Sequence, residues 1–170
     1  ADPRFSHSVI YLCAHSAEGA FGLVLNRPLP HLTLQDVFSQ IGIESAVPMG
    51  STPVLSGGPV ETQRGFVLHE SDGAEETSAQ PLPEGLMLSA STDVLRAIAR
   101  GQGPSAWLLA LGYAGWGPGQ LEQEIKDNSW LTTPADSEIL FDTPIEQRWK
   151  KATEKLGIDL AHLSSDVGHA

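Results

Sequence analysis

The sequence is poor in the residues that most often build recognisable chemical sites. Cys13 is its single cysteine, so a disulfide within the chain is impossible and we expect a reducing compartment. It contains no C-x-x-C or H-x-x-x-H pair of the kind that marks metal sites. No apolar run is long enough to span a membrane, and no secretory signal is visible. We therefore expect a soluble protein that has no membrane partner.

Positive charge is also scarce. Ten Lys and Arg face 21 Asp and Glu, which gives a net charge of −11. A field of that sign repels phosphate backbones, whereas nucleic-acid binders usually carry a basic patch. The densest basic group (Arg148, Lys150, Lys151 and Lys155) has helical spacing and is interpreted as a solvated face. Since no helix pair resembles a helix-turn-helix with a basic recognition helix, we do not expect direct nucleic-acid binding.

What remains is the composition of an ordinary globular domain. The chain has 170 residues, of which 41 % are hydrophobic and 18 % charged, enough for one domain with a real core. It shows no internal repeat and no linker that would divide it, so we predict a single domain over residues 1–170. Twelve prolines and 17 glycines indicate many turns between short elements.

Eight apolar runs bounded by turn residues predict about seven short strands, the runs being 8–15, 19–28, 53–60, 64–70, 86–91, 105–116, 130–136 and 138–142. Pro28 and Pro30 are expected to end the pairing of the second run. Apolar residues at helical spacing predict four helices, within 32–42, 91–101, 119–128 and 143–157, with at most a short one at 158–165. Residues 71–85 are predicted to form an exposed acidic loop. Adjacent strand pairs with irregularly placed helices favour an α+β fold with a mixed or antiparallel sheet.

The stretch LGYAGWGPGQLEQEI, residues 111–125, raises the question of a phosphate-binding loop. Its spacing matches neither the dinucleotide-binding nor the P-loop pattern, and Glu122 and Glu124 would repel a phosphate at the helix start. We interpret it as a structural corner, with Pro118 at the first helical position and with Tyr113 and Trp116 packed against it.

Two further motifs were weighed as chemical sites. The serine of LSGGP, residues 55–59, lacks the preceding glycine of a nucleophile elbow, and the two glycines more simply make a turn. Cys13 and His15 lie two apart on a predicted strand, so they would share a face, and His69 ends another strand. Convergence of these three on zinc is the less favoured alternative, and we expect no metal and no cofactor.

Polar residues at strand ends offer one candidate binding site. His15, Asn26, Arg64 and His69 stand out as neutral-to-basic residues on an acidic chain. Polar side chains at strand ends can gather in a cleft, for which a small anion would be the natural ligand. The structural alternative is turn chemistry, since Asn before a proline-rich bend commonly bonds its own backbone.

Several long motifs together resemble the AlgH/YqgE proteins, an uncharacterised bacterial family. The matching segments are DPRFSHSVIYLCAHSAEGAFGLVLNRPL, LSGGPVETQRGFVLHE, LGYAGWGPGQLEQEIKDNSWL, ILFDTPIEQRWKKA and the terminal GHA. The resemblance implies a strongly bent sheet approaching a half-open barrel with helices outside, in a cytoplasmic protein. Some members are regarded as transcriptional regulators through a link to exopolysaccharide production. The family has no assigned catalytic residues, so the resemblance supplies none.

The chain departs from the family pattern in two places. The apolar strand that ends in MP before the position of Asp2 is missing, which should leave a sheet edge unpaired and favour strand exchange or dimerisation. The family often has Glu where this chain has Ala14, next to His15.

Two functions follow as hypotheses. The first is a non-enzymatic regulator, a monomer or weak dimer, that acts indirectly through a protein partner. The alternative is a small-anion or nucleotide-binding protein or enzyme that uses the four-residue polar cleft.

Overall fold

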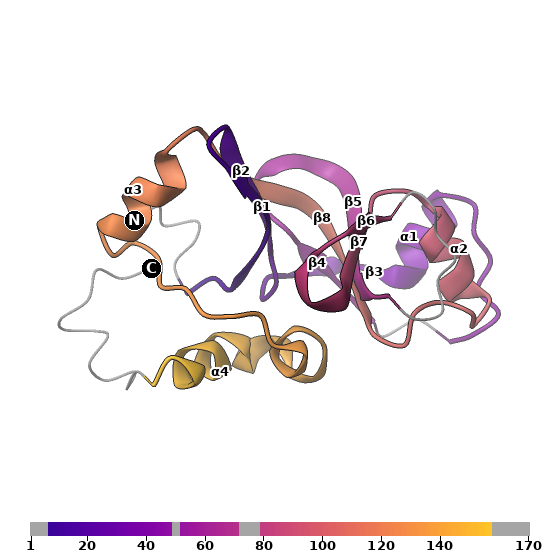
Figure 1. Cartoon of the computed structure of the whole chain (residues 1–170). Helices are drawn as coiled ribbons and strands as arrows, with labels where there is room; N and C mark the ends of the chain where they lie inside the picture. The colour runs from indigo at the N-terminus through magenta and orange to yellow at the C-terminus, as the bar shows by residue number, and fades with distance from the viewer. Residues whose placement is uncertain (1–6, 49–51, 72–78, 158–170) are drawn as a thin grey trace.

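The computed structural model describes residues 7–48, 52–71 and 79–157. It has an α+β fold built on a strongly curled, mostly antiparallel sheet, with helices outside it (Figure 1). This confirms the predicted half-open barrel. Within the described ranges, no helix has the length and apolar character needed to cross a membrane.

Among the described residues the sheet contains eight strands, and its main path runs β1-β2-β8-β5-β7-β6. These strands are β1 (Ile10–Ser16), β2 (Gly19–Val24), β5 (Val60–Glu70), β6 (Gln80–Pro81), β7 (Leu86–Ser89) and β8 (Trp107–Trp116). Two further strands, β3 (Pro28–Thr33) and β4 (Pro53–Ser56), form an antiparallel pair beside it. β4 joins β8 in parallel, and this makes the sheet mixed.

In the part of the chain that the structure describes, four α-helices surround the sheet, as the apolar periodicity predicts. They are α1 (Leu34–Gln40), α2 (Asp93–Ala99), α3 (Gln120–Lys126) and α4 (Arg148–Lys155). Shorter helical turns lie at Pro83–Gly85, Glu138–Asp142 and Ile145–Gln147. α1 begins at a capping box, because the Thr33 hydroxyl accepts from the Asp36 amide and the Asp36 carboxylate accepts from the Thr33 amide.

The pairing of β2 with β1 ends at Val24, before Pro28 and Pro30, as expected. Pro28–Thr33 then forms β3, which was not predicted; an edge strand tolerates prolines that cannot donate. Two of the predicted strands are wrong. Residues 130–136 form no strand, and Glu138–Asp142 is one π-helical turn whose Ile139 and Leu140 are buried. A short apolar run does not by itself distinguish a buried turn of helix from a strand. The possible helix at 158–165 lies outside the described residues.

Gly112 divides the long strand β8 between two different surroundings. Before it, Leu109 and Leu111 lie on the face covered by α1 and α2, where Phe38 and Val94 are buried. Gly112 has a φ of +78°, and the next residue, Tyr113, packs in the concave core instead. The alternation of the strand therefore shifts by one residue at this bulge. Beyond it, Ala114 and Trp116 form a third small core with Leu121 of α3.

Candidate functional site

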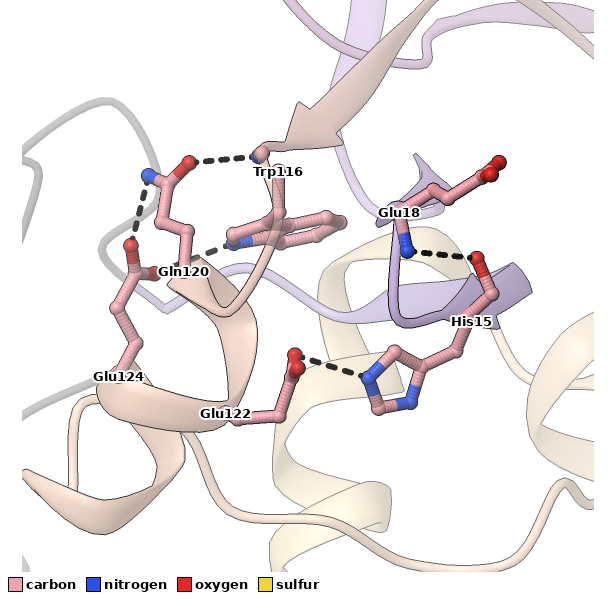
Figure 2. Close-up of polar contacts among 8 residues, drawn as sticks. His15, Glu18, Trp116, Gln120, Glu122 and Glu124 are labelled. Atoms are coloured by element: carbon pink, nitrogen blue, oxygen red, sulfur yellow. Dashed lines mark hydrogen bonds and ion pairs between the residues drawn. The ribbon is translucent and has the colours of Figure 1, made fainter.

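His15 connects the first hairpin to α3 through a contact with Glu122. Its Nε2 lies 3.0 Å from Oε1 of Glu122, and both side chains are exposed (Figure 2). The hydrogen bond to His15 is the main reason that the pKa of Glu122 lies below its usual value. The contact joins residues that are 107 positions apart. It therefore links α3 to the end of β1.

Asn26 serves the local backbone. Its side-chain oxygen accepts from the Val9 amide at 3.0 Å, and its side-chain nitrogen donates to the His7 carbonyl at 2.8 Å. His69 is 1 % exposed, and its ring lies 2.7 Å from the Glu70 carbonyl and 2.8 Å from the Ser89 hydroxyl. Both residues thus satisfy neighbouring polar groups.

Arg64 lies on the concave side of β5, with its guanidinium 5.1 Å from the ring centre of Phe66. It also pairs with Glu61 at 3.5 Å, and both side chains are exposed. His15 lies on the opposite face, since it pairs with Ala20, which packs with Trp116 under α3. The structure therefore does not bring the four polar residues together around one site.

The residues of the zinc alternative are also separated. A bulge between Leu12 and Ala14 shifts the alternation of β1, so Cys13 faces the concave core while His15 faces α3. The prediction that these two share a face is wrong for this reason. Burial raises the pKa of the Cys13 thiol to about 12. In the described part of the chain, no group of three or more His, Cys, Asp or Glu side chains is placed to hold a metal ion.

The glycine corner between β8 and α3 is closed by its own side chains. The Gly117 amide donates to the side-chain oxygen of Gln120 at 2.9 Å (Figure 2). The Glu124 carboxylate accepts from the indole nitrogens of Trp116 at 3.1 Å and Trp130 at 2.8 Å, and from the Gln120 amide at 2.9 Å. The corner is thus a structural element: Gln120 accepts from the Gly117 amide, and Glu124 accepts from the indole nitrogens of two tryptophans.

Two details of this corner differ from prediction. Trp116 packs against α3 as expected, but Tyr113 lies across the sheet with Phe21 and Phe66, at ring distances of 5.3 and 6.0 Å. The bulge at Gly112 explains the difference. Pro118 precedes the helix, because Gly119 with a φ of +74° is the residue that caps it.

An apolar groove of about 730 Å³ lies beside β1. One wall is β1 itself, and the other is formed by the chain that follows α3 and by α4, which lie together on that side of the sheet (Figure 1). The only two large hydrophobic side chains exposed in the described ranges, Leu12 at 40 % and Leu131 at 39 %, both line it. The groove is therefore the candidate functional site.

Sequence reasoning missed this groove, although one signal pointed to it. Ile10, Tyr11, Leu12 and Cys13 are consecutive apolar residues on a strand at the end of the sheet. A strand with one solvated face would alternate. The unbroken run indicates that β1 has apolar side chains on both of its faces, each suited to burial.

A buried arginine fixes the far wall of the groove. The Arg148 guanidinium, at the start of α4, donates to the carbonyls of Leu25 and Thr143. Burial lowers the pKa of this group below its usual value. α4 is thus joined to the end of β2 through carbonyl acceptors.

Comparison with known proteins gives a consistent result. A family model described as AlgH-like matches residues 1–161. A UPF0301 protein of Thioalkalivibrio sulfidiphilus is 54 % identical over 169 residues, which cover 99 % of this chain and 90 % of that protein. The solution structure of the AlgH protein from Pseudomonas aeruginosa is 48 % identical, covers 100 % of this chain and 89 % of that one, and gives a TM-score of 0.78. A Corynebacterium diphtheriae protein, 23 % identical with a TM-score of 0.63 over 86 % of this chain and 76 % of that one, shares the fold.

Proposed function

Because this chain belongs to the AlgH-like family, we propose that it is a cytoplasmic protein-binding module that acts in regulation indirectly, through a protein partner. The groove beside β1 carries the proposal. Contiguous exposed apolar surface with a polar surround marks interaction sites on proteins of this size. Leu12 and Leu131 supply that surface from two walls of one groove.

The charge distribution supports an indirect route over direct DNA binding. The net charge is −11, and the lysines and arginines do not gather on the groove. Lys155 pairs with Asp136 at 3.5 Å, and Arg148 is buried against carbonyls. Two members of the densest basic group in the sequence are therefore engaged in contacts within the protein, and Arg148, which is buried, does not belong to the predicted solvated face.

Site-specific photocross-linking in the source bacterium tests the proposal. A photoreactive amino acid at Leu131 should yield a discrete adduct with another protein, and Leu12→Asp should abolish that adduct. The same photoreactive residue at Gln63, exposed on β5 outside the groove, is the matched control. Equal cross-linking from both positions, or a salt-sensitive and sequence-specific DNA gel shift by the purified protein, would refute the proposal.

A further inference from the structure

The second wall of the groove, across from β1, includes a stretch without regular secondary structure. Residues 130–136, called here the irregular wall, form neither helix nor strand, so no ladder of backbone hydrogen bonds sets their position. Trp130 and Leu131 from this stretch nevertheless line the groove. The later end of the irregular wall is tied to α4, where Lys155 donates to the Pro134 carbonyl. Its start is held differently, by α3.

One residue of α3, Glu124, makes the contacts that hold the start of the irregular wall. Its Oε1 atom accepts from the indole nitrogen of Trp130 at 2.8 Å and from that of Trp116 at 3.1 Å. The two rings meet edge to face, with their centres 6.0 Å apart. The turn between the helix and the wall closes on the same residue, because the Ser129 amide donates to the Glu124 carbonyl at 2.8 Å. Glu124 therefore fixes both the direction of the chain and the indole that enters the groove.

The same helix also reaches the first wall of the groove. Glu122 lies two positions before Glu124, which is about 200° around a helix. It contacts His15 at the end of β1, as Figure 2 shows. None of the residues of α3, all of which the structure describes, lines the groove itself. α3 thus lies outside the groove and is joined to both of its walls.

A single carboxylate oxygen serves both tryptophans. An indole N–H can only donate, so removal of this oxygen takes an acceptor from each ring. Trp116 is 8 % exposed, and Trp130 is half-buried. A buried donor that loses its acceptor is costly, and the less buried ring relieves that cost by turning toward water. Loss of the oxygen is therefore expected to displace Trp130, and Leu131 with it, away from the groove.

We propose that Glu124 is a positioning residue of the groove, which holds Trp130 and Leu131 where a protein partner meets them. This inference rests on the proposed function and identifies the residue that shapes the site from outside it. Glu124 acts on the partner only through the irregular wall, since its own side chain does not line the groove.

Two substitutions of Glu124 separate the acceptor from the charge. Glu124→Met keeps a long side chain with a high helix propensity but removes both oxygens. Glu124→Gln keeps one oxygen that can accept from both indoles, and it gives up only the acceptor for the Gln120 side chain. Both variants remove one negative charge, so any difference between them reports the acceptor alone.

Two measurements on the purified chain need no partner. The indole N–H of Trp130 should exchange with solvent about tenfold faster or more in Glu124→Met, and the affinity of the groove for Nile red, a neutral apolar dye, should fall about tenfold. Glu124→Gln should leave both quantities nearly unchanged. Leu12→Asp should also weaken dye binding, because Leu12 lines the groove.

A packing variant distinguishes positioning from general loss of structure. Leu121 is 5 % exposed in the same small core, and Leu121→Ala weakens that core but keeps the Glu124 oxygen. It should leave the exchange of the Trp130 indole slow. Fast exchange in Leu121→Ala equal to that in Glu124→Met would assign the effect to the packing of α3 and overturn the inference.

Cross-linking in the source bacterium relates the wall to the partner. With the photoreactive residue at Leu131, Glu124→Met should lose most of the protein adduct, whereas Glu124→Gln should retain it. Unchanged exchange and dye binding in Glu124→Met, or equal losses in Glu124→Gln, would refute the role of Glu124 and leave the proposed function intact. Absence of any adduct without a Glu124 substitution would refute the proposed function, and the exchange and dye measurements would still decide whether Glu124 positions the wall.

Discussion

Replacing Gly112 by alanine should destabilise the fold well beyond the cost of its backbone conformation. Gly112 has a φ of +78°, and a Cβ there would lie 2.5 Å from the Gly58 carbonyl oxygen and 3.1 Å from that of Val60. Gly42 has a φ of +74° with nothing within 4 Å of its Cβ position. The pair therefore shares one backbone conformation and differs in the contact alone.

The magnitudes follow from these geometries. A left-handed conformation costs a non-glycine residue about 1–2 kcal/mol, and this term applies to both Gly112→Ala and Gly42→Ala. Forcing packed backbone apart at Gly112 adds about 1–3 kcal/mol. We expect a total loss of about 2–5 kcal/mol for Gly112→Ala and about 1–2 kcal/mol for Gly42→Ala. For a domain of this size, 1 kcal/mol lowers Tm by about 2–4 °C.

Urea unfolding followed by tryptophan fluorescence measures this difference, since Trp116 packs directly beyond the bulge. The comparison is made at equal m-values, so that the two variants unfold from similarly compact states. Equal loss of stability in the two variants would refute the reasoning, because it would show that the contact between the Gly112 and Gly58 backbones contributes nothing beyond the conformation of residue 112.

Two further predictions concern ionisable groups. His15→Ala should return the pKa of Glu122 toward its ordinary value, which a carboxyl NMR titration measures against His31→Ala, and an unchanged pKa would exclude the His15 contact as the cause. Because the pKa of Glu122 is depressed in the fold, the contact stabilises above the ordinary carboxyl pKa and is lost as pH falls through the lowered one. The Cys13 thiol should resist a disulfide reagent at pH 8 in the native protein and react quickly in urea. Since its folded pKa of about 12 exceeds the unfolded value, stability should fall as pH rises from about 9 toward 12, and rapid native reaction would contradict its burial.

The elements that the sequence identifies are those with local causes. The Thr33–Asp36 capping box and the apolar stripe that follows it determine α1, and the long apolar run determines β8. The turn at Glu138–Asp142 has no local signature that separates it from a strand, because its two buried residues are adjacent. Local pattern therefore predicted the fold class and most elements.

The candidate site was harder to predict from the sequence for two reasons. It depends on which face of β1 each side chain occupies, and it is built from segments that lie far apart in the chain. One extra residue in β1 turns His15 away from Cys13, and neither residue type signals that bulge. The groove joins β1 to residues more than 100 positions later, such as Leu131 and Trp149. The residues predicted to bind a ligand were polar, whereas the groove that the fold creates is lined mainly by apolar side chains.

The buried guanidinium of Arg148 anchors the start of α4, which forms the far wall of the groove. The planar fork reaches two carbonyls on different segments, a geometry that the point charge of lysine does not reproduce. From that anchor α4 extends to Lys155, whose ammonium group donates to the Pro134 carbonyl at 3.0 Å and pairs with the Asp136 carboxylate at 3.5 Å. The two ends of this helix are therefore held differently: a buried guanidinium holds its first turn, whereas partly exposed contacts of Lys155, which solvent screens, hold its last turn.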